Sequence, residues 1–283
     1  MATVQVLQTL LTLFSIQLAV LISSGLASNF MITGGYLTEG QNLTYKEYTL
    51  TMQSDCNLVL RNGSTVIWET MTGGYGQGCY LSLYQNGKLY LYTRYGIYSY
   101  PIWNSRTESQ YGTYALVLRY DGTLGIYGPK IWTARSSSAQ PLSTTGTGLV
   151  NWAKVTDSVL YSGDVAPIGT TIVNGGSVLT LQNDCNLVLT NDGVTKWQTG
   201  VTDNTLHDCF VNLEANGEFR VKHWGGDILW TNGVAATAYA EFVLILQSNA
   251  DLGVYGPRIW SSVSASGIGK PSADHGIEMV TDK

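Results

Sequence analysis

Apolar and polar residues alternate in short segments along much of the chain, and Gly, Asn or Asp separates one segment from the next. In the segment QSDCNLVL, residues 53–60, a period of two divides the side chains between two faces. One face carries Cys56, Leu58 and Leu60, and the other carries Gln53, Asp55, Asn57 and Val59. This alternation is typical of a half-buried β-strand whose polar residues face solvent.

An internal repeat arranges these segments in two halves. QSDCNLVL at 53–60 returns as QNDCNLVL at 182–189, and GPKIW at 128–132 returns as GPRIW at 256–260. The repeat predicts two homologous domains, at 29–134 and 150–261. The stretch between them, 135–149, is rich in Ser, Thr and Gly and is predicted to be a linker, while 262–283 is predicted to be a tail.

Six tryptophans, three in each half, indicate a further division of each half. They stand near the ends of successive alternating segments, at Trp68, Trp103 and Trp132 and again at Trp197, Trp230 and Trp260. Three sheets per half, each sending one tryptophan inward, would form a threefold prism around an aromatic core. The predicted fold class is therefore all-β.

The N-terminus indicates export. An apolar run from Leu7 to Ile22 is followed by small residues at Gly25 and Ala27, the pattern of a cleaved secretory signal at 1–27. The run carries no Lys or Arg before it, so a buried strand or a membrane anchor is the alternative interpretation. Sequons at Asn42 and Asn62 are compatible with glycosylation in the secretory pathway, although such matches also occur in ordinary polar turns.

The cysteines support the same compartment. An even number of cysteines in an exported protein indicates disulfides. Their spacing favours bonds within each half, Cys56 with Cys79 and Cys185 with Cys209. In the chain-entropy model each bond would stabilise the fold by roughly 3 kcal/mol.

Composition and charge exclude several functions. Only 12% of the residues are charged, while Gly and Tyr number 32 and 18, which disfavours a helical bundle. The net charge of −5 provides no general attraction for DNA or RNA. No CxxC pair or close histidine pair predicts a metal site, and no nucleophile-elbow or phosphate-binding motif predicts an enzyme, so neither metal nor cofactor is expected.

The repeated segments and the tryptophan spacing resemble the monocot, bulb-type mannose-binding lectins, over roughly residues 29–261. The signature of that family is QxDxNxVxY, present three times per domain on a β-prism II fold, and the whole chain is similar to the two-domain precursors. The resemblance implies three four-stranded sheets per domain and a sugar site on each intact motif. It also implies dimers, of like or unlike chains, formed through exchanged strands, and it places Trp132 and Trp260 on strands exchanged between domains.

Four of the five signature positions are present in the first motif of each half. The resemblance assigns sugar binding to Gln53, Asp55, Asn57 and Val59, and to Gln182, Asp184, Asn186 and Val188. Independently of the family, a carboxylate between two amides offers acceptors and donors to vicinal hydroxyls, and a valine can cover the sugar C–H face. The signature tyrosine is replaced by Arg61 and Thr190, which predicts weak single sites whose multivalency supplies the binding to high-mannose glycans.

The other motifs depart further from the signature. In the third motif of the second half, Gln247, Asn249, Asp251 and Tyr255 form a weaker candidate set for sugar binding. The third motif of the first half, which begins at Arg119, is not expected to bind sugar. The second motifs are not expected to bind mannose. In the first half, tyrosines at 84, 90 and 92 replace the signature, and this face is open to three interpretations: stacking on sugars, a protein interface, or simple β-propensity.

Two functions from different classes follow. The first is a secreted or vacuolar plant lectin for mannose-containing glycans, acting in defence or storage. The alternative is a lectin-related protein that has lost sugar affinity and acts through protein contacts or as a storage protein; its main support is the missing tyrosine at Arg61 and Thr190.

Overall fold

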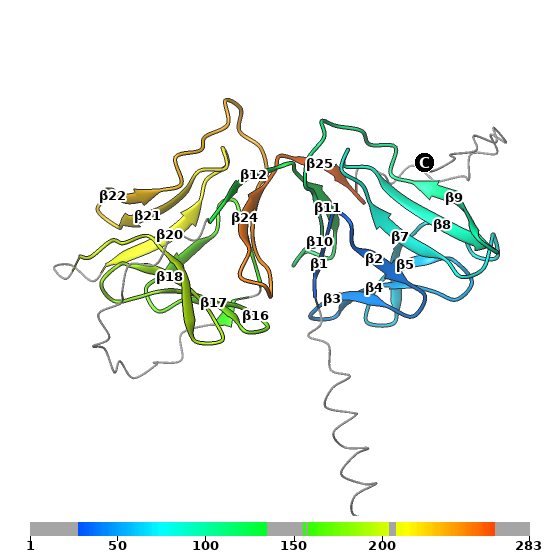
Figure 1. The fold of residues 1–283 in the computed structure, drawn as a ribbon, viewed down its shortest axis with the longest axis horizontal. Helices are drawn as coiled ribbons and strands as arrows, with labels where there is room; N and C mark the ends of the chain where they lie inside the picture. The colour runs from blue at the N-terminus through cyan, green and yellow to red at the C-terminus, as the bar shows by residue number, and fades with distance from the viewer. Residues whose placement is uncertain (1–27, 135–154, 157, 204–207, 264–283) are drawn as a thin grey trace, which may run out of the picture.

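The computed structural model describes residues 28–134, 155–156, 158–203 and 208–263, and these residues form strands and turns. Six sheets make two prisms that lie side by side (Figure 1). We call them the N-terminal unit and the C-terminal unit, after the repeat that supplies most of each. The described residues include no helix long and apolar enough to cross a membrane.

Three four-stranded sheets form the N-terminal unit. The first contains β3 (Asn42–Tyr45), β4 (Tyr48–Met52), β5 (Leu58–Asn62) and β6 (Thr65–Glu69). The second contains β2 (Tyr36–Thr38), β7 (Tyr80–Leu83), β8 (Leu89–Tyr95) and β9 (Tyr98–Asn104). The third contains β1 (Phe30–Ile32), β10 (Ala115–Leu118), β11 (Leu124–Tyr127) and β25 (Arg258–Ser261).

The C-terminal unit repeats this plan. Its first sheet contains β16 (Thr171–Asn174), β17 (Ser177–Leu181), β18 (Leu187–Asn191) and β19 (Val194–Gln198), extended by the two-residue β13 (Val155–Thr156), which pairs parallel to β16. The second contains β15 (Val165–Pro167), β20 (Cys209–Leu213), β21 (Phe219–His223) and β22 (Ile228–Thr231). The third contains β12 (Lys130–Thr133), β14 (Val159–Tyr161), β23 (Val243–Leu246) and β24 (Leu252–Tyr255).

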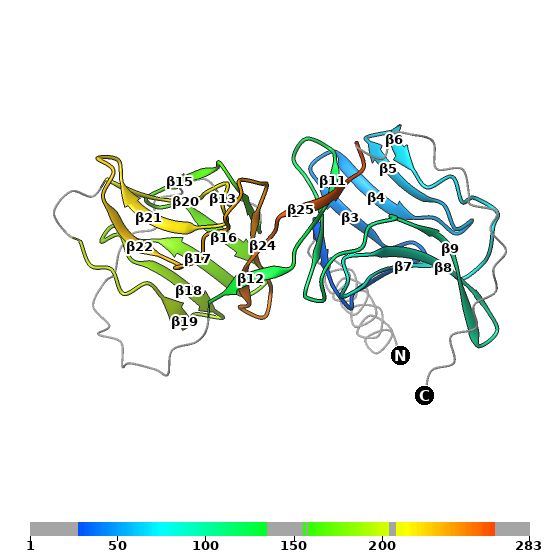
Figure 2. The ribbon, with the colours of Figure 1, turned by 90° about the horizontal axis from the view of Figure 1, so that it is seen from above.

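The last strand of each repeat crosses to the other unit. Strand β25, from the second repeat, pairs with β11 of the N-terminal unit, and β12, from the first repeat, pairs with β24 of the C-terminal unit (Figure 2). The exchange between domains that the family resemblance implied for the strands of Trp132 and Trp260 is confirmed, and it joins the two repeats of one chain. The limits of the sequence repeats and those of the packed units therefore differ by one strand on each side.

Three tryptophans meet at the centre of each unit. Trp68 lies edge to face with Trp103 and with Trp260, at centroid distances of 5.9 and 6.1 Å. In the C-terminal unit the three are Trp132, Trp197 and Trp230, with centroids 5.4–6.0 Å apart. The predicted aromatic prism is confirmed, and in each unit the third tryptophan arrives on the exchanged strand.

A β-bulge directly precedes each of these tryptophans. In the first sheet, for example, Leu60 opposes Trp68 and Arg61 opposes Val66, so Ile67 is the extra residue. The outer strands of the other five sheets show the same register shift. Because a bulge bends its strand and re-aims the next side chain, it turns each tryptophan toward the axis of the prism.

The third sheets of the two units pack against each other. Nine buried residues from both units form one apolar cluster between them: Phe30, Ala115, Val117, Tyr127, Val159, Tyr161, Val243, Ile245 and Tyr255. Arg119, only 8% exposed, bonds across this junction to Glu241 at 2.6 Å. Burying apolar surface in this way stabilises the pair of units as one body.

Both predicted disulfides are present. Cys56 is bonded to Cys79, and Cys185 to Cys209, so each bond closes a loop inside one repeat. Of the other predicted segments, the signal at 1–27 and the linker at 135–149 lie outside the described residues. The predicted tail begins later than expected, because Ser262 is still buried and its backbone N–H donates to the oxygen of Leu124 at 3.0 Å.

Candidate carbohydrate site

The first candidate site is a tight turn, and the prediction of a continuous strand over 53–60 was wrong. Strand β4 ends at Met52 and β5 begins at Leu58. Between them, the backbone N–H of Gln53 donates to the backbone carbonyl of Asn57 at 2.9 Å, and the backbone N–H of Cys56 donates to the backbone carbonyl of Gln53 at 3.1 Å. Cys56 adopts a φ of 74°, so the period of two breaks at this residue and the chain reverses direction.

The same turn occurs between β17 and β18. The backbone N–H of Gln182 donates to the backbone carbonyl of Asn186 at 2.9 Å. The backbone N–H of Cys185, whose φ is 65°, donates to the backbone carbonyl of Gln182 at 3.0 Å. In both turns the aspartate caps the asparagine backbone: Asp55 Oδ1 accepts from Asn57 at 2.9 Å, and Asp184 Oδ1 accepts from Asn186 at 3.0 Å. The repeated sequence therefore builds one geometry twice.

The asparagine of each turn holds the following loop in place. Asn57 Oδ1 accepts from the Thr70 hydroxyl and the Thr72 backbone N–H, both at 3.2 Å, while its Nδ2 donates to Glu69 at 2.6 Å. Both ends of this amide are thus used inside the protein. Nδ2 carries a second proton, which leaves one donor of Asn57 for a ligand.

Asn186 has a matching set of contacts. Its Oδ1 accepts from the Thr199 hydroxyl and the Gly200 N–H at 3.0 Å, and its Nδ2 donates to Gln198 at 3.2 Å. The sequence analysis did not identify the loop partners Glu69, Thr70, Gln198 and Thr199. Their signal is the tripeptide that ends each first sheet, WET at 68–70 and WQT at 197–199.

Each turn leaves a carboxylate oxygen available. Oδ2 of Asp55 and Oδ2 of Asp184 accept no hydrogen bond from the described residues, and Asp55 is exposed. Gln53 is half-buried beside Asp55, and Gln182 is exposed beside Asp184. Each turn therefore presents one free acceptor, a glutamine amide and one asparagine proton, a set suited to vicinal hydroxyls.

The two valines contribute less open apolar surface than expected. Val59 is 2% exposed and Val188 is 7% exposed, because they lie on central strands between Thr51 and Glu69 and between Thr180 and Gln198. At the position of the signature tyrosine, Arg61 donates to the Ser64 oxygen at 3.3 Å and Thr190 contacts the Val178 oxygen at 3.5 Å. Neither residue reproduces a phenol beside the carboxylate.

The second sheets lack this arrangement. In the C-terminal unit, Arg220 pairs with Glu214 at 3.0 Å and also with Glu218, so the motif positions satisfy one another. In the N-terminal unit the turn is kept, since the Tyr84 amide donates to the Lys88 oxygen at 2.9 Å. Its motif positions, however, hold Tyr84, Asn86, Lys88, Tyr90 and Tyr92, so no carboxylate stands between two amides.

The third-motif side chains form contacts within the third sheet of the C-terminal unit, which includes β12 from the first repeat. Asp251 accepts from Lys130 Nζ at 2.6 Å, from Thr133 at 2.9 Å and from Gln247 at 2.8 Å. Tyr255 is fully buried, its hydroxyl contacts Gln247 at 3.3 Å, and burial raises its pKa above the usual range. Asn249 caps the Asp251 backbone at 3.0 Å. Sugar binding by this set stays a prediction, but Gln247, Asp251 and Tyr255 already have partners within the protein.

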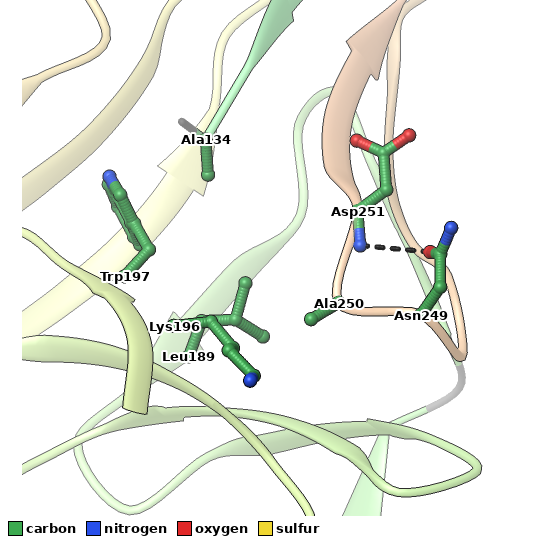
Figure 3. A pocket seen from close by; sticks show the side chains of 7 residues that line it. All are labelled: Ala134, Leu189, Lys196, Trp197, Asn249, Ala250 and Asp251. Carbon is green, nitrogen blue, oxygen red and sulfur yellow. Dashed lines mark hydrogen bonds between the residues drawn. The ribbon is translucent and has the colours of Figure 1, made fainter. Parts of the chain in front are cut away.

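A cavity of about 310 Å³ lies beside this third motif, where the first and third sheets of the C-terminal unit meet (Figure 3). Its lining includes Trp197 and Lys196 from β19 and Asn249 and Asp251 from the β23–β24 turn. It is separate from the Asp184 turn. Among the described residues no group of three or more His, Cys, Asp or Glu side chains could hold a metal ion.

Comparison with known proteins gives the relationships of the chain. Mannose-specific lectin 2 of Colocasia esculenta is 32% identical over 253 residues, which are 89% of this chain and 91% of that protein. Mannose-specific lectin 1 of Crocus vernus is 32% identical over 271 residues, 93% and 98% of the two chains. The chain belongs to the monocot mannose-binding lectin family. No family model matches it.

The fold of this lectin also has a solved two-domain counterpart. The native fetuin-binding agglutinin of Scilla campanulata superposes with a TM-score of 0.69 at 27% identity, over 83% of this chain and all of that one. The β-prism II architecture and the function of a carbohydrate-binding lectin are therefore shown.

Proposed function

We propose that this lectin binds mannose-containing glycans, including high-mannose glycans, through the two first-motif turns. The observation that carries the proposal is the duplicated geometry: the turns at Asp55 and Asp184 share their backbone bonds, their asparagine anchor and their free carboxylate oxygen. Relatives at 32% identity are mannose-specific by name. An axial hydroxyl would be selected because the wrong epimer leaves polar groups of the turn unpaired.

The proposed action is binding without catalysis. The two aspartates lie in separate units, and the second carboxylate at the first turn, that of Glu69, accepts a hydrogen bond from Asn57 Nδ2 at 2.6 Å, so these groups do not form the free pair of carboxylates that glycoside hydrolysis uses. Export to the secretory pathway, with a secreted or vacuolar location and a role in plant defence or storage, belongs to the same proposal. Its support is the sequence of residues 1–27 and the two disulfides, which form in oxidising compartments. Asn42 and Asn62 are exposed, as glycosylation would require.

The test is binding to a glycan array and to mannan-agarose. The variants Asp55→Ala and Asp184→Ala should each reduce binding, and the double variant should abolish it. Arg61→Tyr with Thr190→Tyr should strengthen binding by restoring a hydroxyl at each site, about three- to tenfold per site. Retention of full binding by the double alanine variant would move the sites elsewhere.

The lectin-related alternative has its own support. The valines at 59 and 188 are nearly closed to solvent, and the phenol position is lost at both sites. On that reading the wild-type protein binds no mannose-containing glycan, and the array separates it from the main proposal.

A dimer of chains also remains part of the proposal, and sedimentation of the purified lectin at several concentrations tests it.

A further inference from the structure

The second sheet of the N-terminal unit carries a surface that the mannose sites do not explain. Its outward positions hold five tyrosines and two cations, which we call the tyrosine face: Tyr36, Tyr80, Tyr84, Lys88, Tyr90, Tyr92 and Arg94. The face belongs to the sheet of β2, β7, β8 and β9, which is a different sheet from the one that packs at the junction (Figure 1).

The rings form a connected ladder. Tyr80 stacks on Tyr92 with centroids 5.2 Å apart and planes at 16°, and Tyr36 meets Tyr80 edge to face at 5.6 Å. Tyr84 meets Tyr90 at 5.3 Å, and Tyr90 meets Tyr92 at 5.5 Å. Tyr36 is 61% exposed and Tyr84 is 42% exposed, so the ladder keeps open ring surface.

A cation stands at each end of this ladder. Arg94 lies over the Tyr80 ring at 4.9 Å and Lys88 over the Tyr90 ring at 5.3 Å. Neither forms an ion pair with a described carboxylate, and residues 70–107 contain no Asp or Glu. A guanidinium that stacks on a ring keeps its N–H edge free for a bidentate carboxylate. In a chain of net charge −5, this sheet is a local positive surface.

The matching sheet of the C-terminal unit shows that such a face is not required by the fold. There, Glu214 and Glu218 neutralise Arg220 at the motif positions, and the turn that precedes β22 carries Asp227. The only sheet tyrosines of this kind are therefore those of the N-terminal unit, among the described residues. That sheet has one cation over a ring, Lys222 over Phe210 at 6.0 Å, but its described residues form no row of tyrosines between two cations.

We propose that the tyrosine face is a second carbohydrate site, specific for acidic glycans that carry hexuronate residues. The open rings of Tyr36 and Tyr84 contact the C–H groups of the sugars, the stacked rings between them hold the two cations in place, and Arg94 and Lys88 bind the carboxylates. Six positions of an extended strand separate the two cations, a span of about 20 Å, so a ligand that reaches both has several sugar rings. This site is independent of the proposed mannose function.

The experiment compares hexuronate oligosaccharides of increasing length with neutral oligosaccharides of the same lengths, by isothermal titration on the full-length lectin. Affinity for the hexuronate series should rise with length and fall with added salt, while the neutral series stays weak. Lys88→Gln with Arg94→Gln should lower hexuronate affinity about tenfold and leave mannan binding unchanged. Tyr84→Ala should weaken it, and Tyr84→Phe should keep it, because stacking needs the ring.

A matched control removes the same charge elsewhere. Lys46→Gln with Lys222→Gln takes one cation from each unit outside the face and should leave hexuronate affinity intact. The double variant Asp55→Ala, Asp184→Ala should also bind hexuronates normally, which separates this proposal from the mannose proposal. Thermal unfolding of every variant checks the fold.

Two results would overturn the proposal. One is hexuronate binding equal to that of neutral sugars, or binding that the Lys88 and Arg94 changes leave intact. The other is a wild-type dimer that Tyr36→Ala with Tyr84→Ala dissociates, since the face would then be a protein interface.

Discussion

At the scale of single residues, the asparagine and the aspartate of each sugar turn have different duties. Asn57 Oδ1 accepts hydrogen bonds from Thr70 and Thr72, and one Nδ2 proton is donated to Glu69. Asp55 Oδ2, in contrast, accepts no hydrogen bond from the described residues. The sequence placed both in one motif, but it did not distinguish an anchor from a ligand. That distinction depends on the loop after Trp68, which the fold brings back to the turn.

We therefore expect Asn57→Ala to destabilise the N-terminal unit by about 1–2 kcal/mol, because the Thr72 N–H loses its acceptor. Asp55→Asn keeps the Oδ1 cap and should change the free energy of unfolding little, while it lowers mannan binding. Urea unfolding and binding of both variants are the measurements. Equal stability of the two variants would contradict the separation of roles.

His223 is the residue with the clearest pH dependence. Its ring lies between Asp208, which contacts Nδ1, and Asp203, 2.8 Å from Nε2, and these hydrogen bonds raise its pKa above 6.5. Only the protonated ring can donate to both carboxylates. Asp203 also holds the first-motif turn of its unit, since its backbone N–H donates to the Asp184 oxygen at 2.8 Å.

We call His223 with Asp203 and Asp208 the clamp. Because the pKa of His223 is raised in the folded state, the clamp contributes its full stability below a pH of about 6.5 and loses it as the pH rises through the folded-state pKa. The free energy of unfolding of the wild type should therefore fall over that range relative to His223→Gln. Urea titrations at several pH values from about 5 to about 9 give the difference. A constant difference would show that the clamp does not titrate.

At the scale of elements, the exchanged strands make each unit depend on the other repeat. Trp260 enters the N-terminal core on β25, while Trp132 enters the C-terminal core on β12. The alternating pattern identified both strands but gave no sign of which core they fill, because their local sequences, GPKIW and GPRIW, are nearly the same.

Truncating an exchanged tryptophan should therefore weaken the unit of the other repeat. Trp260→Ala should cost about 3–5 kcal/mol and raise amide exchange first in β5 and β8 of the N-terminal unit. Trp132→Ala is the matched control and should affect β18 and β21 instead. Loss of protection in the repeat that carries the substitution would refute the exchange.

At the scale of the whole molecule, one chain presents two weak sites on units held together by a buried junction. Binding of a multivalent ligand to both sites multiplies affinity through effective concentration, on the order of 10²-fold or more. Asp184→Ala alone should thus lower affinity for a multivalent high-mannose glycan by a factor of that order. For monomeric mannose the same variant should only halve the number of sites, and titration with both ligands distinguishes the cases.

The sequence by itself determined the elements, the twofold repeat, the tryptophan prism, the disulfide pairs and the family, because these follow from local alternation and from spacing along the chain. Tertiary structure decided which unit β12 and β25 complete, that the motif is a turn closed at Cys56, and that Val59 and Tyr255 are buried. It also decided that the tyrosines of β7 and β8 stack as one ladder between two cations. The turn at Cys56 is closed by bonds within five residues, which a period of two does not reveal. The other features depend on contacts between residues far apart in the chain, and periodicity carries no information about which distant strands pack together.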